Sequence, residues 1–215
     1  MPADQAAGLR RRSTRQPVSC IHCFSESTGS SVRMAHALHQ IGHESLLVDT
    51  QGRLFADATT RSLFDWRRQL ERGQLHTLSQ PYGKGWYAPG LQADEPALHG
   101  VMLAYDHVIF DAGWRDAGLG LRPDAVHAVA IEIRHRDESM RHAYAVLKTL
   151  AQRARVSCVG LLGDPGACER VRVACCRFLG QGFADVLFRA ENEDDAFAVL
   201  AVRMAGEETS LRACK

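Results

Sequence analysis

The sequence lacks three features that would narrow its function at once: a net charge, a long apolar run and an even set of cysteines. Its 26 Lys and Arg nearly balance 25 Asp and Glu, so a formal charge of +1 provides no overall attraction to nucleic acid or anionic membranes. No apolar run approaches the roughly 18–20 residues of a membrane-spanning helix, and the N-terminus has no signal-peptide core. We therefore expect a cytoplasmic protein without nucleic acid as a partner.

The composition is that of an ordinary globular domain, with 46% hydrophobic and 24% charged residues. Seven cysteines, an odd number in a reducing compartment, do not indicate a disulfide framework. We expect a flexible arm over residues 1–16, a single domain over 17–205 and a short polar tail over 206–215.

Apolar runs typical of buried strands alternate along the domain with segments of helical periodicity. This alternation predicts an α/β fold: a doubly wound, mostly parallel sheet with helices on both faces. The expected strands cover 18–24, 45–49, 86–88, 106–111, 128–133, 156–162 and 184–188. The expected helices cover 31–41, 61–71, 96–104, 138–153, 167–179 and 194–204.

The region from residue 18 to residue 50 reads as strand, polar loop, helix and strand, which is half of a parallel βαβ unit. In such a unit, phosphate groups usually bind to the N–H groups at the start of the helix. Two apolar strands end in carboxylates, Asp49 and Asp111, which in nucleotide-binding α/β proteins hold Mg²⁺ or its waters. Each aspartate alone could equally cap the turn that follows its strand.

Several segments resemble the MinD/ParA type of P-loop NTPase. HALHQIGHESLLVDT is similar to that family's segment leading into its second strand, and YDHVIFDAG resembles its switch segment. DESMRHAYAVLKTLAQRARV and CCRFLGQGFADVLF resemble stretches of the flagellar branch, FlhG. The resemblance covers about residues 17–190 and implies a MinD-like P-loop NTPase fold.

The phosphate loop departs from the motif of this family, which reads K-G-G-x-G-K-[ST]. His22 and Ser27 replace its two lysines, and Glu26 would face the phosphates with the wrong sign of charge. Without a lysine, the several negative charges of a nucleotide lack a counter-charge in a partly dry loop. The resemblance therefore implies a degenerate loop.

Other positions of the family's nucleotide site have also changed. Gln51 stands where a second aspartate would orient the attacking water, and Gly163 or Asp164 stands where an asparagine would read adenine. We expect a P-loop fold without nucleotide, cofactor or catalytic residue of its own. The alternative is a divergent but active ATPase that uses ATP and Mg²⁺. The remnant nucleotide and magnesium site would comprise Ser27, Thr28, Asp49 and Asp111.

The N-terminal arm matches the family far better than the phosphate loop does. Residues 4–10 match D-Q-A-x-x-L-R, a motif that FlhG proteins carry at their N-terminus. The resemblance implies that this segment folds on an FlhF-type GTPase and activates it. Other flagellar regulatory or switch proteins remain open as partners. The activating residues would be Asp4, Gln5, Ala6, Leu9 and Arg10.

Two further features bear on membranes and metals. The amphipathic membrane helix at the C-terminus of the family is not visible in the polar segment 205–215, so we expect no stable membrane anchor. Cys20 and Cys23 form a CxxC pair that could be redox-active or half of a metal site. Residues three apart in a strand point to opposite faces, so buried structural thiols and no metal are the expectation.

Overall fold

The computed structural model describes residues 18–27, 29–55, 68, 77–88, 90–114, 120–153, 156–189 and 195–205. The strands are β1 (Val18–Phe24), β2 (Ser45–Asp49), β3 (Leu78–Gln80), β4 (Gly83–Tyr87), β5 (His107–Ala112), β6 (Ala125–Ile133), β7 (Val156–Gly163) and β8 (Leu187–Arg189). The helices are α2 (Gly29–Gln40), the 3₁₀ turn η1 (Pro96–Leu98), α4 (His99–Met102), α5 (Asp137–Arg153), α6 (Pro165–Phe178), α7 (Gln181–Ala184) and α8 (Ala196–Met204). In the described part of the chain, no helix is long and apolar enough to cross a membrane.

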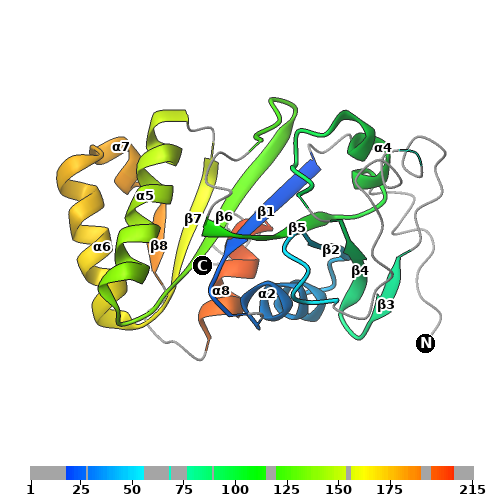
Figure 1. Ribbon diagram of the computed structural model, residues 1–215, viewed down its shortest axis with the longest axis horizontal. Coiled ribbons are helices and arrows are strands. Elements are labelled where there is room, and N and C mark those ends of the chain that lie inside the picture. The colour runs from blue at the N-terminus through cyan, green and yellow to red at the C-terminus, as the bar shows by residue number, and fades with distance from the viewer. Residues whose placement is uncertain are drawn as a thin grey trace, which may run out of the picture.

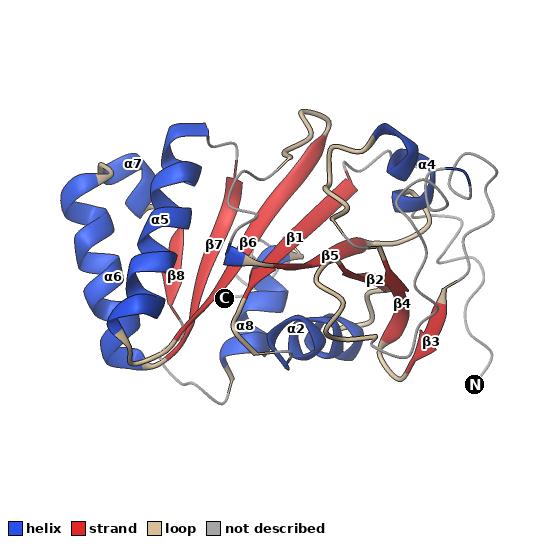
Figure 2. Cartoon of the chain, in the orientation of Figure 1, coloured by secondary structure: helices blue, strands red, loops and turns tan. Residues whose placement is uncertain are grey.

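The described strands form one sheet in the order β3-β4-β2-β5-β1-β6-β7-β8 (Figure 2). All neighbouring strands pair in parallel except β3 and β4, which form an antiparallel hairpin at one edge. The predicted doubly wound, mostly parallel sheet is therefore confirmed.

Helices cover both faces of the sheet, and β6 shows how its side chains divide between them (Figure 1). Val129 and Ile131 pack with α5 and α6 on one face, whereas Ala128 and Ala130 pack with α2 and α8 on the other. At the other end of the sheet, a third cluster packs η1 and α4 against β2, β4 and β5. The core is thus built from strand residues that alternate between the faces, as a buried parallel sheet requires.

Helix α2 follows from its sequence. Its buried residues include Met34, Ala35 and Leu38, which share one helical face. Gly42, with φ of +84°, terminates the helix as predicted: its N–H bonds to the His39 carbonyl, and the next N–H bonds to the Leu38 carbonyl.

The remaining expectations differ in detail. The strand expected at 86–88 is the end of a hairpin, and the helix expected at 96–104 is a 3₁₀ turn followed by a single α-turn. The strand expected at 184–188 is β8, displaced because α7 occupies its first residue. The helix expected at 61–71 lies outside the described residues apart from Arg68.

Candidate functional site

The carboxyl ends of β2, β5, β1 and β6 meet along one edge of the sheet, where the sequence predicts the remnant site. The strand pairing places Asp49 opposite Asp111, and Phe24 opposite Ile131. Ser25, which directly follows β1, therefore lies beside Glu132 near the end of β6. This edge is where open α/β folds bind ligands.

Glu132 of β6 fills the loop in which phosphate would be expected. The hydroxyls of Ser25, Ser27 and Ser30 lie 2.6, 2.6 and 2.7 Å from the same oxygen, Oε2 of Glu132. We call these three residues the serine cup. Ser25 and Ser30 are buried, so their hydroxyls bond to the carboxylate and not to bulk water.

The serine cup determines the protonation of Glu132. Burial raises the pKa of this carboxyl, but the hydroxyls of Ser25, Ser27 and Ser30 together lower it below its ordinary value. Glu132 is therefore an anion at neutral pH. The serine cup therefore holds a negative charge that comes from the chain itself.

Two arginines after β6 bind the carboxylates at the rim of this loop. Arg136 forms an ion pair with Glu26, the residue that interrupts the phosphate motif. Arg134 lies 3.9 Å from Glu26 and 4.0 Å from Glu132. The loop carboxylates are thus neutralised by protein cations.

Arg53 binds Asp111, the strand-end carboxylate that the sequence predicts as part of a remnant magnesium site. Its Nε and Nη2 donate to the two carboxylate oxygens of Asp111 at 2.7 and 2.8 Å, and its Nη1 donates to the Ser25 carbonyl at 2.8 Å. Ser31 also donates to Asp111, at 2.9 Å. In P-loop NTPases, a Ser or Thr of the loop and an Asp at a strand end hold Mg²⁺. Here Asp111 accepts from both the Ser31 hydroxyl and the Arg53 guanidinium.

The Arg53–Asp111 pair is fixed by its surroundings. Asp111 is fully buried, while the Arg53 side chain is 24% exposed. The hydrogen bonds to Asp111 raise the pKa of Arg53, which keeps the guanidinium charged. Two parallel N–H···O bonds to one carboxylate are the strongest geometry available to an arginine.

Asp49 organises the loop that carries Arg53. Its Oδ1 accepts the N–H groups of residues 51, 52 and 53, and its Oδ2 accepts those of residues 54 and 55, at 2.7 to 3.3 Å. A carboxylate with five backbone donors is fully committed to the loop. These bonds are the ones expected from the capping alternative for Asp49, and its role as a magnesium ligand stays a prediction.

His22, which aligns with the first lysine of the motif, is a core residue. Its side chain is 3% exposed, stacks on Phe110 and places Nε2 3.1 Å from Nδ1 of His127. Burial, followed by the nearby His127, lowers the pKa of His22 to about 3. His22 is neutral at physiological pH and provides no charge for a phosphate.

The two cysteines of the CxxC pair are buried and free, and they belong to core clusters on opposite faces of the sheet, as predicted. Burial raises the pKa of Cys20 to about 12 and raises the pKa of Cys23 further still. Both residues are therefore thiols rather than thiolates at neutral pH, which disfavours redox chemistry. Within the described residues, no group of three or more His, Cys, Asp and Glu side chains could hold a metal ion.

The other predicted positions divide into two groups. Gly163 adopts a φ of +97°, and Asp164 caps α6 by accepting the Ala167 N–H at 2.7 Å, so this pair is structural. Gln51 is exposed beside Gly113. The predicted residues outside the described part of the chain are Asp4, Gln5, Ala6, Leu9, Arg10 and Thr28.

Two residues that complete the site, Glu132 and Arg53, were not predicted from the sequence. Glu132 had a usable signal, because it is a single carboxylate within the apolar strand 128–133. Arg53 had no such signal in the sequence, because it lies in a loop 58 residues from its partner Asp111.

Comparisons with known proteins agree with this fold. No family model matches the sequence, and no curated protein matches it. Among solved structures, a chain of the MinC:MinD cell division protein complex of Aquifex aeolicus shares 16% identity with a TM-score of 0.52, covering 88% of this chain and 96% of that one. The MinD cell division protein of Aquifex aeolicus shares 14% identity with a TM-score of 0.52, covering 89% and 97%. At such identities the likeness establishes the MinD-type α/β fold alone.

Proposed function

We propose that this chain is an FlhG-like regulatory protein of flagellar number or placement, built on the MinD/ParA fold. Its own nucleotide site is closed, and its N-terminal arm activates an FlhF-type GTPase. The observation that carries the closed site is the double replacement at the sheet edge. Glu132 stands where phosphate would bind, and Arg53 stands where Mg²⁺ would bind.

Electrostatics makes this closure effective against nucleotides. A phosphate entering the serine cup would meet the charge of Glu132, and two like charges about 4 Å apart near a protein surface repel by about 4 kcal/mol. Magnesium at Asp111 would have to displace a bidentate guanidinium. Both displacements would be needed together, because the metal and the phosphates bind as one unit.

The arm supports the second half of the proposal. Its match to D-Q-A-x-x-L-R includes Gln5, whose side-chain amide can orient the water that attacks GTP, and such groups can be supplied in trans. Leu9 would fill an apolar pocket of the GTPase, and Arg10 would pair with acid or phosphate. A segment that folds on its partner binds with moderate affinity, because binding must first order it.

GTP hydrolysis by the FlhF-type GTPase tests this mechanism. The full chain and a peptide of residues 1–16 should both stimulate turnover, whereas residues 17–215 should not. Gln5→Ala should lower the maximal rate and leave the apparent affinity nearly unchanged, while Leu9→Ala should weaken the affinity. Stimulation by residues 17–215 equal to that of the full chain would refute the role of the arm.

Thermal unfolding with ATP and Mg²⁺ separates this proposal from a divergent, active ATPase. A ligand at a hundredfold excess over its Kd stabilises a protein by about 2.7 kcal/mol, which is easily seen. We expect no change in melting temperature at millimolar ATP. An ATP-dependent rise that Asp111→Ala abolishes would support the ATPase instead.

A further inference from the structure

Helices α5 and α6 present an exposed groove away from the sheet edge described above. Both helices follow strands of the parallel part of the sheet, so they run in the same direction side by side (Figure 1). Met140 and Tyr144 of α5 line the groove together with Val171 and Ala174 of α6. Its floor is therefore apolar and aromatic.

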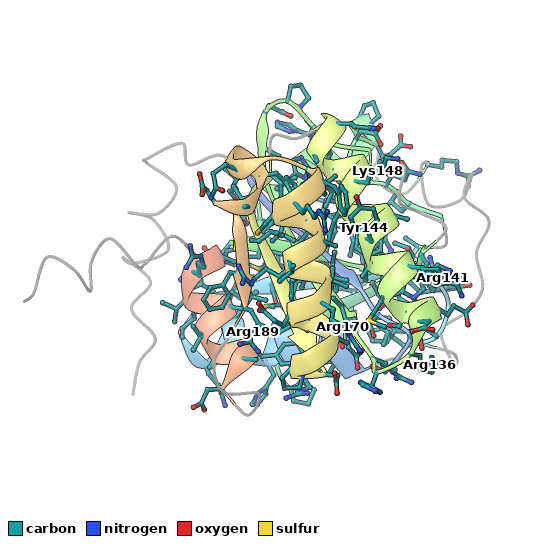
Figure 3. The ribbon with its side chains drawn as sticks, turned by 90° about the vertical axis from the view of Figure 1, so that its left-hand side faces the viewer. Arg136, Arg141, Tyr144, Lys148, Arg170 and Arg189 are labelled. Atoms are coloured by element: carbon teal, nitrogen blue, oxygen red, sulfur yellow. The ribbon has the colours of Figure 1, made fainter. Side chains whose placement is uncertain are left out.

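Cations flank this floor on both helices. Arg141 and Lys148 are exposed on α5, and Arg170 and Arg177 are exposed on α6. Figure 3 looks onto this face and shows Arg141, Tyr144 and Lys148 following one another along α5, with Arg170 on the neighbouring α6. Among the described residues that line the groove, the one carboxylate is Asp137, at the start of α5.

None of these cations forms a close ion pair within the described part of the protein, where no carboxylate lies within 4 Å of Arg141, Lys148, Arg170 or Arg177. Arg141 makes a long bond of 3.4 Å to a backbone carbonyl, and Arg170 lies 3.4 Å from a histidine nitrogen. Because the whole chain has a formal charge of only +1, this is a local excess of positive charge.

The spacing of the cations fits a helix. Arg141 and Lys148 are seven residues apart, as are Arg170 and Arg177, which on a helix is a rise of about 10.5 Å, or two turns. Two rows of charges with this repeat, on either side of an apolar strip, match an amphipathic helix with an apolar seam flanked by carboxylates. A nucleic-acid duplex fits less well, because its charged backbone offers no apolar seam to cover Met140, Tyr144 and Val171.

We propose that the groove between α5 and α6 binds an acidic amphipathic helix of a partner protein. The helix places its apolar seam on Tyr144 and Ala174, and its carboxylates pair with Arg141, Lys148 and Arg170. None of the residues that line this groove belongs to the serine cup or to the Arg53–Asp111 pair, so the groove provides a further contact for an assembly. The binding is expected to weaken with salt, because exposed charges are screened.

Fluorescence anisotropy with the full chain tests this proposal. The probe is a labelled synthetic peptide of about three heptads with Leu at positions a and d and Glu at e and g. The double variant Arg141→Glu/Arg170→Glu should bind it roughly tenfold more weakly or worse, because each reversal replaces an attraction with a repulsion. Tyr144→Ser should also weaken binding. The matched control Arg68→Glu/Lys84→Glu changes the charge equally at exposed positions that do not line the groove and should bind like the parent.

Two further probes distinguish other occupants. The same peptide with Gln in place of Glu should bind much more weakly, and equal binding would show that the cations play no part. A labelled DNA duplex should bind more weakly than the acidic peptide. Tighter binding of DNA that is lost in Arg141→Glu/Arg170→Glu would overturn the proposal and make this face a nucleic-acid surface.

Discussion

Removal of the Glu132 side chain should create an anion-binding site that a small carboxylate can refill. In Glu132→Ala the serine cup loses the oxygen that its three hydroxyls share, although Ser25 keeps another acceptor, the Ser27 carbonyl at 2.6 Å. A hydrogen bond to a charged group contributes about 1.5–3 kcal/mol, but these three bonds share one oxygen, so we expect a total loss of about 3 kcal/mol. For a chain of this size, that loss lowers the melting temperature by roughly 6–12 °C.

Formate is the appropriate probe because it supplies the missing carboxylate and little else. At a tenfold excess over its Kd, it should return about 1.4 kcal/mol, or roughly 3–6 °C, to Glu132→Ala. Thermal unfolding over a formate titration, at constant ionic strength with chloride, measures this effect. Glu132→Gln keeps the volume of the side chain, so the cup stays filled and formate should have no effect.

The control for this experiment is Glu138→Ala, which removes an exposed carboxylate of α5 outside the cup. Formate should not change its melting temperature. The reasoning is refuted if Glu132→Ala melts like the parent protein, or if formate stabilises Glu138→Ala as much as Glu132→Ala.

Two other predictions follow from buried charges and buried bases. Arg53→Ala should lower the free energy of unfolding in urea by about 3–5 kcal/mol, because it leaves the buried Asp111 carboxylate unpaired. The double variant Arg53→Ala/Asp111→Ala should lose less than the sum of the two single variants. His22 has a folded-state pKa of about 3, below its unfolded value of about 6.5. The unfolded state therefore binds the proton first, and the free energy of unfolding falls as pH drops below about 6.5, by up to about 1.4 kcal/mol per pH unit. His22→Leu should flatten this slope between pH 6.5 and 4.5, the exposed-site variant His36→Gln should not, and equal slopes in all three proteins would contradict the assignment.

The fold was predictable because it depends on patterns that are local in the sequence. Apolar runs such as 45–49 and 156–162 can be satisfied only by strands buried on both faces, and the helical periodicity between them requires helices that cover those faces. The segment 96–104 was misjudged because Pro96 begins a 3₁₀ turn whose α-helical continuation ends after one turn.

The site was predictable in position but not in chemistry. The strand-end aspartates Asp49 and Asp111 do lie at the carboxyl edge of the sheet, as their sequence context indicates. Their roles depend on which groups approach from other segments, and these are Arg53 for Asp111 and five backbone N–H groups for Asp49. A single sequence contains no local signal for such pairings.

The two replacements at the sheet edge are physically linked. A buried Asp111 requires a cation, and in the absence of a metal only Arg53 supplies one among the described residues. The serine cup, buried next to it, requires an acceptor, and Glu132 supplies it. Both needs are therefore met by groups of the chain itself, Arg53 for Asp111 and Glu132 for the serine cup.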